Sequence, residues 1–134
     1  MFILSIAIAP VLALVVYFYR KDKHEKEPLE LLLGAFFGGM VIIFFALIFE
    51  SVLMFFVEAV NIFVIRIFLE AFLVAAFVEE GLKFCVFRRI IYKNKEFNEP
   101  YDGILYAVMI SLGFAALENI KYAIVYYFKL GFLA

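Results

Sequence analysis

Residues 31–57 read LLLGAFFGGMVIIFFALIFESVLMFFV, an apolar run that carries a single charge, at Glu50. A helix needs about 20 mostly apolar residues to cross a lipid bilayer. The uncharged part from Leu31 to Phe49 nearly reaches that length, and a helix that continues past Glu50 would end near Val57. This stretch therefore predicts a membrane-spanning helix, and with it the class of fold.

The composition of the whole chain supports a membrane protein. Of its 134 residues, 68% are hydrophobic and only 19% are charged. Soluble domains have about 45–50% apolar and about 25% charged residues, and a domain this small cannot bury so much apolar surface. An ordinary soluble protein and a disordered one are excluded. The 12 basic and 13 acidic residues nearly balance, which argues against nucleic acid as a partner.

Three further apolar runs predict spans at residues 2–19, 62–87 and 103–128. Arg20 and Lys21 follow the first run without a small-residue cleavage site, so we expect a retained span rather than a signal peptide. The polar/apolar alternation of a membrane barrel is missing. The prediction is an all-α polytopic membrane protein, a single domain over residues 1–134 with four transmembrane helices.

Basic residues predict the orientation of this bundle. The loops at 20–30 and 88–101 contain most of the lysines and arginines: Arg20, Lys21, Lys23, Lys26, Arg88, Arg89, Lys93 and Lys95. The positive-inside rule places both loops in the cytoplasm and both termini outside. Small residues also recur along two spans and predict close helix packing. They are Gly34, Ala35, Gly38 and Gly39 on the second span, and Gly103, Ala107, Ser111 and Ala115 on the fourth.

The third span contains an unusual group of charges, Glu79, Glu80 and Lys83. A carboxylate at mid-bilayer costs about 2.5–3.5 kcal/mol even on the lenient insertion scale, so it needs a partner, a proton or a water-filled cavity. Two adjacent carboxylates repel, which predicts a raised pKa for one of them and a role in general acid–base chemistry. The structural alternative is an ion pair between Glu79 and Lys83, one helical turn apart.

The fourth span adds Phe114, Glu118 and Asn119. Glu118 lies far from either end of the span, and its structural alternative is a pair with Lys121. Asp102 opens the span, and we expect it to cap the helix. The remaining charges favour structural roles. We expect Arg66 to neutralise Glu70, Glu50 and Glu58 to lie at the outer interface, His24 to be solvated in its loop, and Cys85 to be a buried, inert thiol.

Three motifs in this order resemble the PrsW family of bacterial intramembrane proteases. They are Tyr17–Asp22 with Glu27 and Pro28, then Glu79-Glu80-Gly81-Leu82-Lys83, and then Tyr101-Asp102-Gly103 leading to Phe114-Ala115-Ala116-Leu117-Glu118-Asn119. The last two are similar to the family's Glu-Glu-x-x-Lys and Phe-x-x-x-Glu motifs. The resemblance covers essentially the whole chain.

The resemblance implies a bacterial membrane endopeptidase. Members cleave single-span membrane proteins, notably an anti-sigma factor, in a stress response, and they are distantly similar to CAAX-type endopeptidases that use glutamate-activated water. By this resemblance Glu79 or Glu80 is the base, Glu118 assists, and Lys83 tunes the pair. Tetrahedral intermediates need an oxyanion donor, for which Asn119 is the candidate.

The sequence also departs from the family pattern. Members continue with further helices that carry histidine motifs, whereas the one His of this chain lies in its first loop. The chain by itself specifies no metal site, and zinc would need additional ligands. Two other functions therefore stay open: an inactive or truncated relative that binds membrane helices, and a small proton or ion pathway. The predicted partners are the lipid bilayer and a single-span membrane protein as substrate. The cut site and the oligomeric state are left open.

Overall fold

The computed structural model describes residues 2–22 and 26–131, and these residues are helical or in connecting turns, with no strand among them. Three helices are long: α1 (Phe2–Lys21), α2 (Leu29–Val57) and α5 (Pro100–Gly131). Between α2 and α5 four helical segments follow one another: α3 (Phe63–Leu69), η1 (Glu70–Phe77), α4 (Val78–Val86) and η2 (Phe87–Ile91). The predicted all-α class is confirmed.

The four middle segments form one continuous helical path, because the residue at each junction keeps helical backbone angles. Two stretches of the path, η1 and η2, have π-helical hydrogen bonding, in which each turn is widened by one residue. The path covers the span predicted at 62–87 and extends to Ile91.

Among the described residues, three helical stretches are long and apolar enough to cross a membrane: 4–21, 29–57 and 100–129. The sequence predicts four spans. The π-helical segments divide the middle path into pieces that are each shorter than a span, so the crossing by residues 63–91 stays a prediction.

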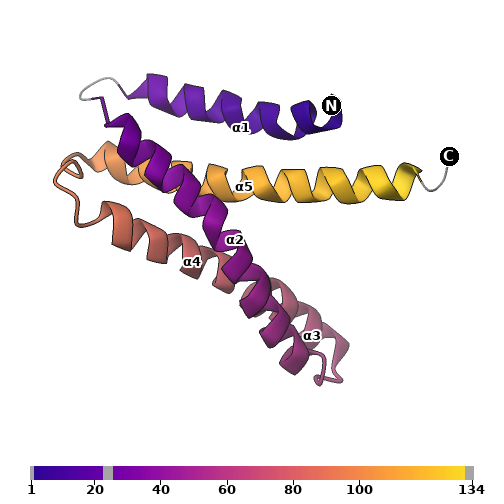
Figure 1. Cartoon of the computed structure of the whole chain (residues 1–134). Helices are drawn as coiled ribbons and strands as arrows, with labels where there is room; N and C mark the ends of the chain where they lie inside the picture. Colours follow the sequence, from indigo (N-terminus) through magenta and orange to yellow (C-terminus); the bar gives the residue numbers. More distant parts are fainter. Residues whose placement is uncertain (1, 23–25, 132–134) are drawn as a thin grey trace.

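Figure 1 shows how the helices are arranged. α1 lies along α5, while α2 crosses α5 obliquely and then runs beside the path from α3 to η2. α1 and η2 end, and α2 and α5 begin, at one end of the molecule. The helix ends that flank the two basic loops therefore lie together, and the placement of these loops on the cytoplasmic side of the membrane remains a prediction.

The crossing of α2 and α5 depends on two glycines. A Cβ atom built on Gly39 would lie 1.9 Å from the carbonyl oxygen of Ile110, and one built on Gly113 would lie 1.9 Å from that of Phe36. Any side chain at either position would collide with backbone. The crossing buries Ala35 and Ile110 almost completely, and the largest hydrophobic cluster forms around it.

The glycine pattern differs in part from the prediction. Gly38 packs near Val86 and Ile90, whereas nothing lies within 4 Å of a Cβ on Gly34. On α5 it is Gly113, two residues from the nearest members of the predicted stripe, that meets α2. Ala107 and Ser111 of the stripe are exposed. This part of the stripe thus faces open space, because the close approach uses the other side of the helix.

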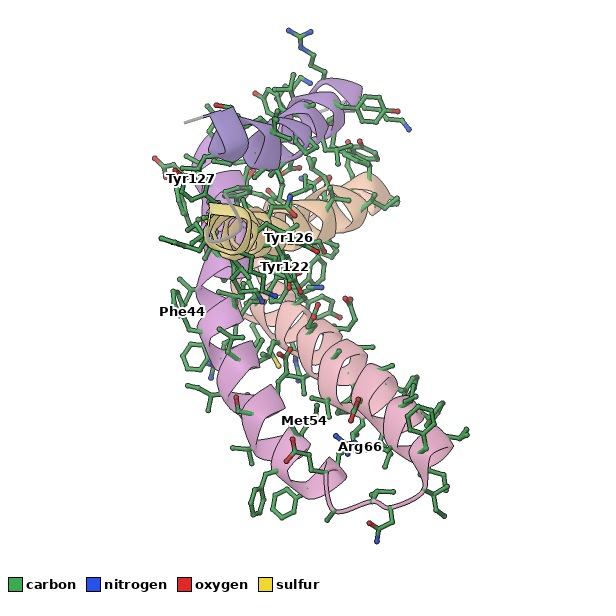
Figure 2. The ribbon with its side chains drawn as sticks, turned by 90° about the vertical axis from the view of Figure 1, so that its right-hand side faces the viewer. Phe44, Met54, Arg66, Tyr122, Tyr126 and Tyr127 are labelled. Atoms are coloured by element: carbon green, nitrogen blue, oxygen red, sulfur yellow. The ribbon has the colours of Figure 1, made fainter. Side chains whose placement is uncertain are left out.

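Large apolar side chains cover much of the outer surface. Phe44 on α2 and Tyr126 and Tyr127 on α5 project away from the helices in Figure 2, and each is more than half exposed. Exposed apolar area on this scale is what a lipid-facing surface requires.

Candidate functional site

Lys83 is the centre of the charged group on α4. Its ammonium lies 2.8 Å from Glu80 Oε1 and 3.3 Å from Glu79 Oε2. The three side chains differ in exposure: 15% for Lys83, 25% for Glu79 and 72% for Glu80. The predicted pair of Glu79 with Lys83 is confirmed, and the structure adds Glu80 as a second partner of the same cation.

Lys83 also connects α4 to α5. Its ammonium lies 4.6 Å from the centre of the Phe114 ring, a cation–π contact between the two helices. Phe114 is buried, with 3% of its surface exposed. Because Phe114 precedes Glu118 by one helical turn, this contact brings the acidic motifs of the two helices to the same region.

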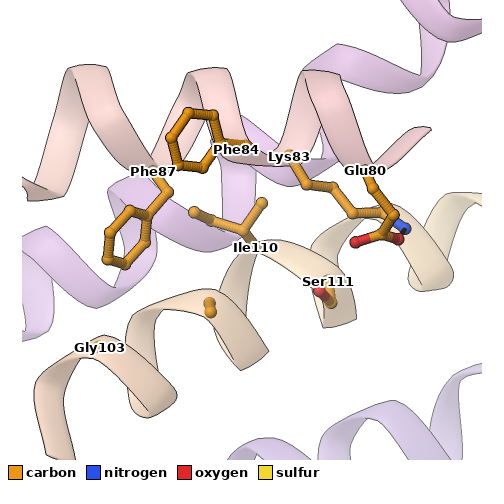
Figure 3. A pocket seen from close by; sticks show the side chains of 8 residues that line it. Glu80, Lys83, Phe84, Phe87, Gly103, Ile110 and Ser111 are labelled. Atoms are coloured by element: carbon orange, nitrogen blue, oxygen red, sulfur yellow. Dashed lines mark hydrogen bonds and ion pairs between the residues drawn. The ribbon is translucent and has the colours of Figure 1, made fainter. Parts of the chain in front are cut away.

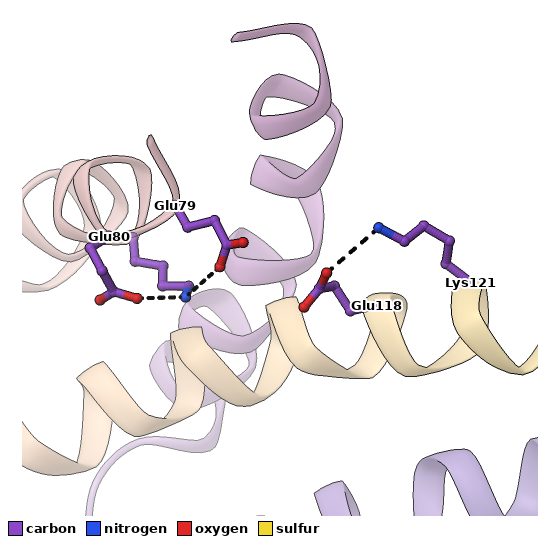
Figure 4. A network of polar contacts seen from close by, with 5 residues as sticks. Glu79, Glu80, Glu118 and Lys121 are labelled. Atoms are coloured by element: carbon purple, nitrogen blue, oxygen red, sulfur yellow. Dashed lines mark hydrogen bonds and ion pairs between the residues drawn. The ribbon is translucent and has the colours of Figure 1, made fainter. Parts of the chain in front are cut away.

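Glu118 is half-buried and lies 3.5 Å from Lys121 Nζ. The predicted pairing is therefore present. In Figure 4 the carboxylates of Glu79 and Glu118 point into the same space between α4 and α5. The oblique arrangement of the helices allows this even though the two residues lie at different depths along their own helices.

Glu50 of α2 joins this group, which the sequence did not predict; its position at the outer interface stays a prediction. α2 continues through Glu50 to Val57, and Glu50 is half-buried. Its carboxylate is within electrostatic range of Glu79, Glu118 and Lys121. The signal was present in the sequence, since Glu50 interrupts one continuous apolar run, but only the helix crossing shows what it faces.

A groove of about 310 Å³ opens beside the charged group. Figure 3 shows Glu80, Lys83, Phe84 and Phe87 on one wall and α5 on the other. The α5 wall is formed by Gly103, Ala107, Ile110 and Ser111. The small residues of the predicted stripe thus form the floor of a groove with a charged end and an apolar length.

Asn119 lies outside this group. Its side-chain nitrogen donates to the carbonyl oxygen of Ala7 on α1, at 3.1 Å. Ala7 lies one turn before Pro10, where the proline ring disturbs the helical hydrogen bonds. In this conformation Asn119 therefore connects α5 to α1.

Asp102 caps α5, as expected. Its Oδ2 atom accepts hydrogen bonds from the backbone amides of Asn98 and Glu99, at 2.9 and 2.7 Å. These amides precede the helix and have no partner within it. Asp102 is almost completely buried and lies far along α5 from Glu118, so it does not belong to the group around Lys83.

Three remaining expectations have different outcomes. Arg66 Nε lies 2.7 Å from Glu70 Oε1, which confirms that pair. Cys85 is exposed, so the prediction of a buried thiol was wrong; Cys85 lies among Arg88, Arg89 and Lys93 instead of at a helix contact. His24 lies outside the described residues.

The described residues contain no group of three or more His, Cys, Asp or Glu side chains that could hold a metal ion. In the charged group, the cations beside the carboxylates are lysine ammonium groups. The described residues therefore do not form a metal site by themselves.

Carboxylates held by lysines between long apolar helices define a membrane protein with a polar, intramembrane centre. Residues 27–129 match the family described as PrsW family intramembrane metalloprotease. The chain belongs to the PrsW family.

Individual relatives agree with this assignment. The chain is 43% identical over 120 residues to protease PrsW of Geobacillus kaustophilus (strain HTA426), which covers 90% of this chain and 51% of the relative. It is 42% identical over 122 residues to protease PrsW of Bacillus subtilis (strain 168), covering 91% and 54%. The chain thus spans about half the length of the curated relatives it matches. No solved structure matches it.

Proposed function

We propose that this chain carries the water-activating carboxylates of a PrsW-type intramembrane protease. The observation that supports this most directly is the group formed by Glu79, Glu80 and Lys83 on α4, which contacts Phe114 of α5 and lies beside a groove. The relatives are proteases by name. A half-buried carboxylate next to a groove is the arrangement that general-base catalysis needs.

Glu79 is the better candidate for the base. It is more buried than Glu80, its bond to Lys83 is longer, and it points toward the space shared with Glu118. In the proposed reaction, the Glu79 carboxylate takes a proton from water while the water oxygen attacks the scissile carbonyl carbon. The same proton then passes to the leaving amine as the peptide C–N bond breaks. Glu118 positions the water, and Lys83 holds both carboxylates of α4 in place through its hydrogen bonds.

The groove indicates the class of substrate. Its apolar length, with Phe84 and Phe87, suits the side chains of a membrane-embedded segment, and its charged end with Glu80 and Lys83 is where a peptide bond would meet water. We propose a single-span membrane protein, such as an anti-sigma factor whose cleavage starts a stress response, as the substrate.

The test is cleavage of a tagged single-span anti-sigma factor produced together with the full-length protein in a bacterial membrane. We expect the wild type to yield a shortened fragment, and Glu79→Gln to reduce its formation by about 100-fold or more, the usual contribution of a general base. Glu80→Gln should reduce it less. Glu70→Gln serves as the matched control. It removes a carboxylate from the ion pair between Glu70 of η1 and Arg66 of α3, and this pair is remote from the groove.

Measuring substrate binding together with cleavage distinguishes a protease from the alternative functions. A protease that loses its base should still be co-purified with its substrate. Equal cleavage by wild type and by the double variant of Glu79 and Glu80 would contradict the proposal. Co-purification without any cleavage by the wild type would favour a protein that binds membrane helices, and proton flux lost in Glu79→Gln without proteolysis would favour an ion pathway.

A further inference from the structure

A second group of acids lies away from the groove, where the helices begin and end. Asp22 follows α1, Glu27 precedes α2, and Asp102 is in the first turn of α5. Each is at most 5% exposed. Carboxyl groups are seldom buried so completely unless they are paired or protonated.

A hydrogen bond joins Glu27 to α5. The hydroxyl group of Tyr106, a fully buried residue, donates to Glu27 Oε2. Asp102, whose Oδ2 accepts two backbone amides, lies within electrostatic range of Glu27. The start of α5 therefore presents both a donor and a second acid to the buried Glu27.

The neighbouring cation that the structure describes, Lys26, does not pair with this group. Lys26 directs its ammonium to the backbone carbonyl oxygens of Tyr19 and Asp22 rather than to a carboxylate. Asp22 Oδ2 is buried without a hydrogen-bond partner among the described residues. Glu27 thus faces Asp22 from the end of α1, and Asp102 and Tyr106 from α5.

This environment favours the neutral form of Glu27. Burial raises its pKa from 4.5 to about 7, the bond from Tyr106 opposes that shift, and the charges of Asp102 and Asp22 add to it. Glu27 lies between the membrane-spanning stretches 4–21 and 29–57, at the end of the bundle where the basic loops lie.

We propose that Glu27, Asp102 and Tyr106 form a proton-dependent clasp, which holds residues 26–28, just before α2, against the start of α5 and releases them when Glu27 loses its proton. With Glu27 neutral, its carboxyl group accepts from Tyr106 and brings no charge next to Asp102. When its proton leaves, Glu27 becomes a buried charge close to Asp102 and Asp22, so repulsion and the cost of burying the charge both favour separation.

The direction of the pH effect follows from linkage. Because the pKa of Glu27 is higher in the folded than in the unfolded protein, its neutral form stabilises the closed clasp fully below about pH 4.5. This stabilisation falls as pH rises and is lost once pH passes about 7. The basic loops are predicted to be cytoplasmic, so the clasp is expected to respond to cytoplasmic pH.

Trypsin provides a direct test on the full-length protein in lipid vesicles. Lys26 begins the segment held by the clasp and Lys21 ends α1, and both are trypsin cleavage sites. Cleavage rates from pH 5.5 to 8.5 should be divided by those of a free peptide with the sequence of residues 17–32, which removes the pH dependence of trypsin itself. We expect the normalised rate in the wild type to rise at least fivefold, with a midpoint near pH 7.

Two variants and a control decide the outcome. Glu27→Gln keeps the shape and the acceptor for Tyr106 but cannot ionise, so its rate should stay low at every pH. Tyr106→Phe removes the donor that stabilises ionised Glu27, so its midpoint should move to higher pH. Glu30→Gln changes an exposed neighbouring acid and should behave as the wild type. An identical pH course in wild type and Glu27→Gln would overturn the clasp, as would a flat wild-type course. Neither outcome depends on proteolytic activity.

Discussion

The ammonium of Lys83 lies 4.6 Å above the ring of Phe114 while it also pairs with Glu79 and Glu80. A single side chain on α4 therefore pairs with two carboxylates and contacts the helix that carries Glu118. Charge-assisted hydrogen bonds of this kind are about twice as strong as neutral ones, and a low-dielectric environment strengthens them further.

Lys83→Gln should therefore damage the site more than it damages the fold. Without the ammonium, Glu79 and Glu80 lose the partner that holds them and their like charges repel each other, so the base is displaced from its position. We expect cleavage of the single-span substrate to fall about 10- to 100-fold, with a smaller loss for Lys83→Arg, which keeps the charge.

Arg66→Gln is the matched control for this prediction. It removes a cation from an i,i+4 pair with Glu70, on a helix segment outside the groove, and exposed pairs contribute at most about 1 kcal/mol. Cleavage should stay near the wild-type rate. A similar fall in both variants would indicate a general loss of folded protein rather than a specific role for Lys83.

The glycines of α2 offer a test of the helix crossing. Gly39→Ala would place a methyl group 1.9 Å from the backbone oxygen of Ile110, and rigid backbone on both helices must then separate. We expect a loss of about 1–3 kcal/mol or more, the usual cost of overpacking. The measurement is the thermal unfolding midpoint in detergent.

Gly34→Ala is the internal comparison for Gly39→Ala. Nothing lies within 4 Å of a Cβ at Gly34, and alanine is the better helix former, so the midpoint should stay or rise. If the two variants unfolded at the same temperature, α2 and α5 would not cross at Gly39.

A substitution at Asn119 can distinguish a structural role of this residue from a catalytic one. Its amide donates to Ala7 on α1, so Asn119→Leu should lower stability by about 0.5–1.5 kcal/mol, the net value of one hydrogen bond. Cleavage, corrected for the amount of folded protein, should remain close to wild type. Loss of an oxyanion donor would instead reduce the rate by about 10²–10³ without this loss of stability, and that result would return Asn119 to the catalytic site.

The sequence alone predicts the helices better than it predicts which helices contact one another. Long apolar runs and the charges within them suffice to predict the all-α class and the pairs Glu79–Lys83 and Glu118–Lys121, because these features depend on local spacing. The position of Glu50 and the buried group around Glu27 depend on which helices cross. That choice is made by contacts such as Gly39 with Ile110, which join residues far apart in the chain.

Helical periodicity explains why the small-residue contacts predicted on α2 and on α5 are only partly correct. The sequence contains several small residues on each of α2 and α5, and spacing cannot decide which of them meets the other helix. Gly113 rather than the stripe through Ala107 and Ser111 meets α2, and this leaves the stripe open to the groove. The orientation of a helix about its own axis requires knowledge of its neighbours.

Asp102→Asn tests how the charge of Asp102 acts on Glu27 within the clasp. It should move the midpoint of trypsin cleavage to lower pH, whereas Tyr106→Phe should move it to higher pH. The asparagine keeps an oxygen that can accept from the amides of Asn98 and Glu99, so α5 should stay capped. It removes a negative charge beside Glu27, and this change lowers the pKa of Glu27 from about 7. The stabilisation from neutral Glu27 should then be lost at a lower pH. Both the trypsin midpoint and the pH at which thermal stability falls should move down together. A midpoint that stayed in place or rose would mean that Asp102 serves only as a helix cap and that Glu27 does not sense its charge.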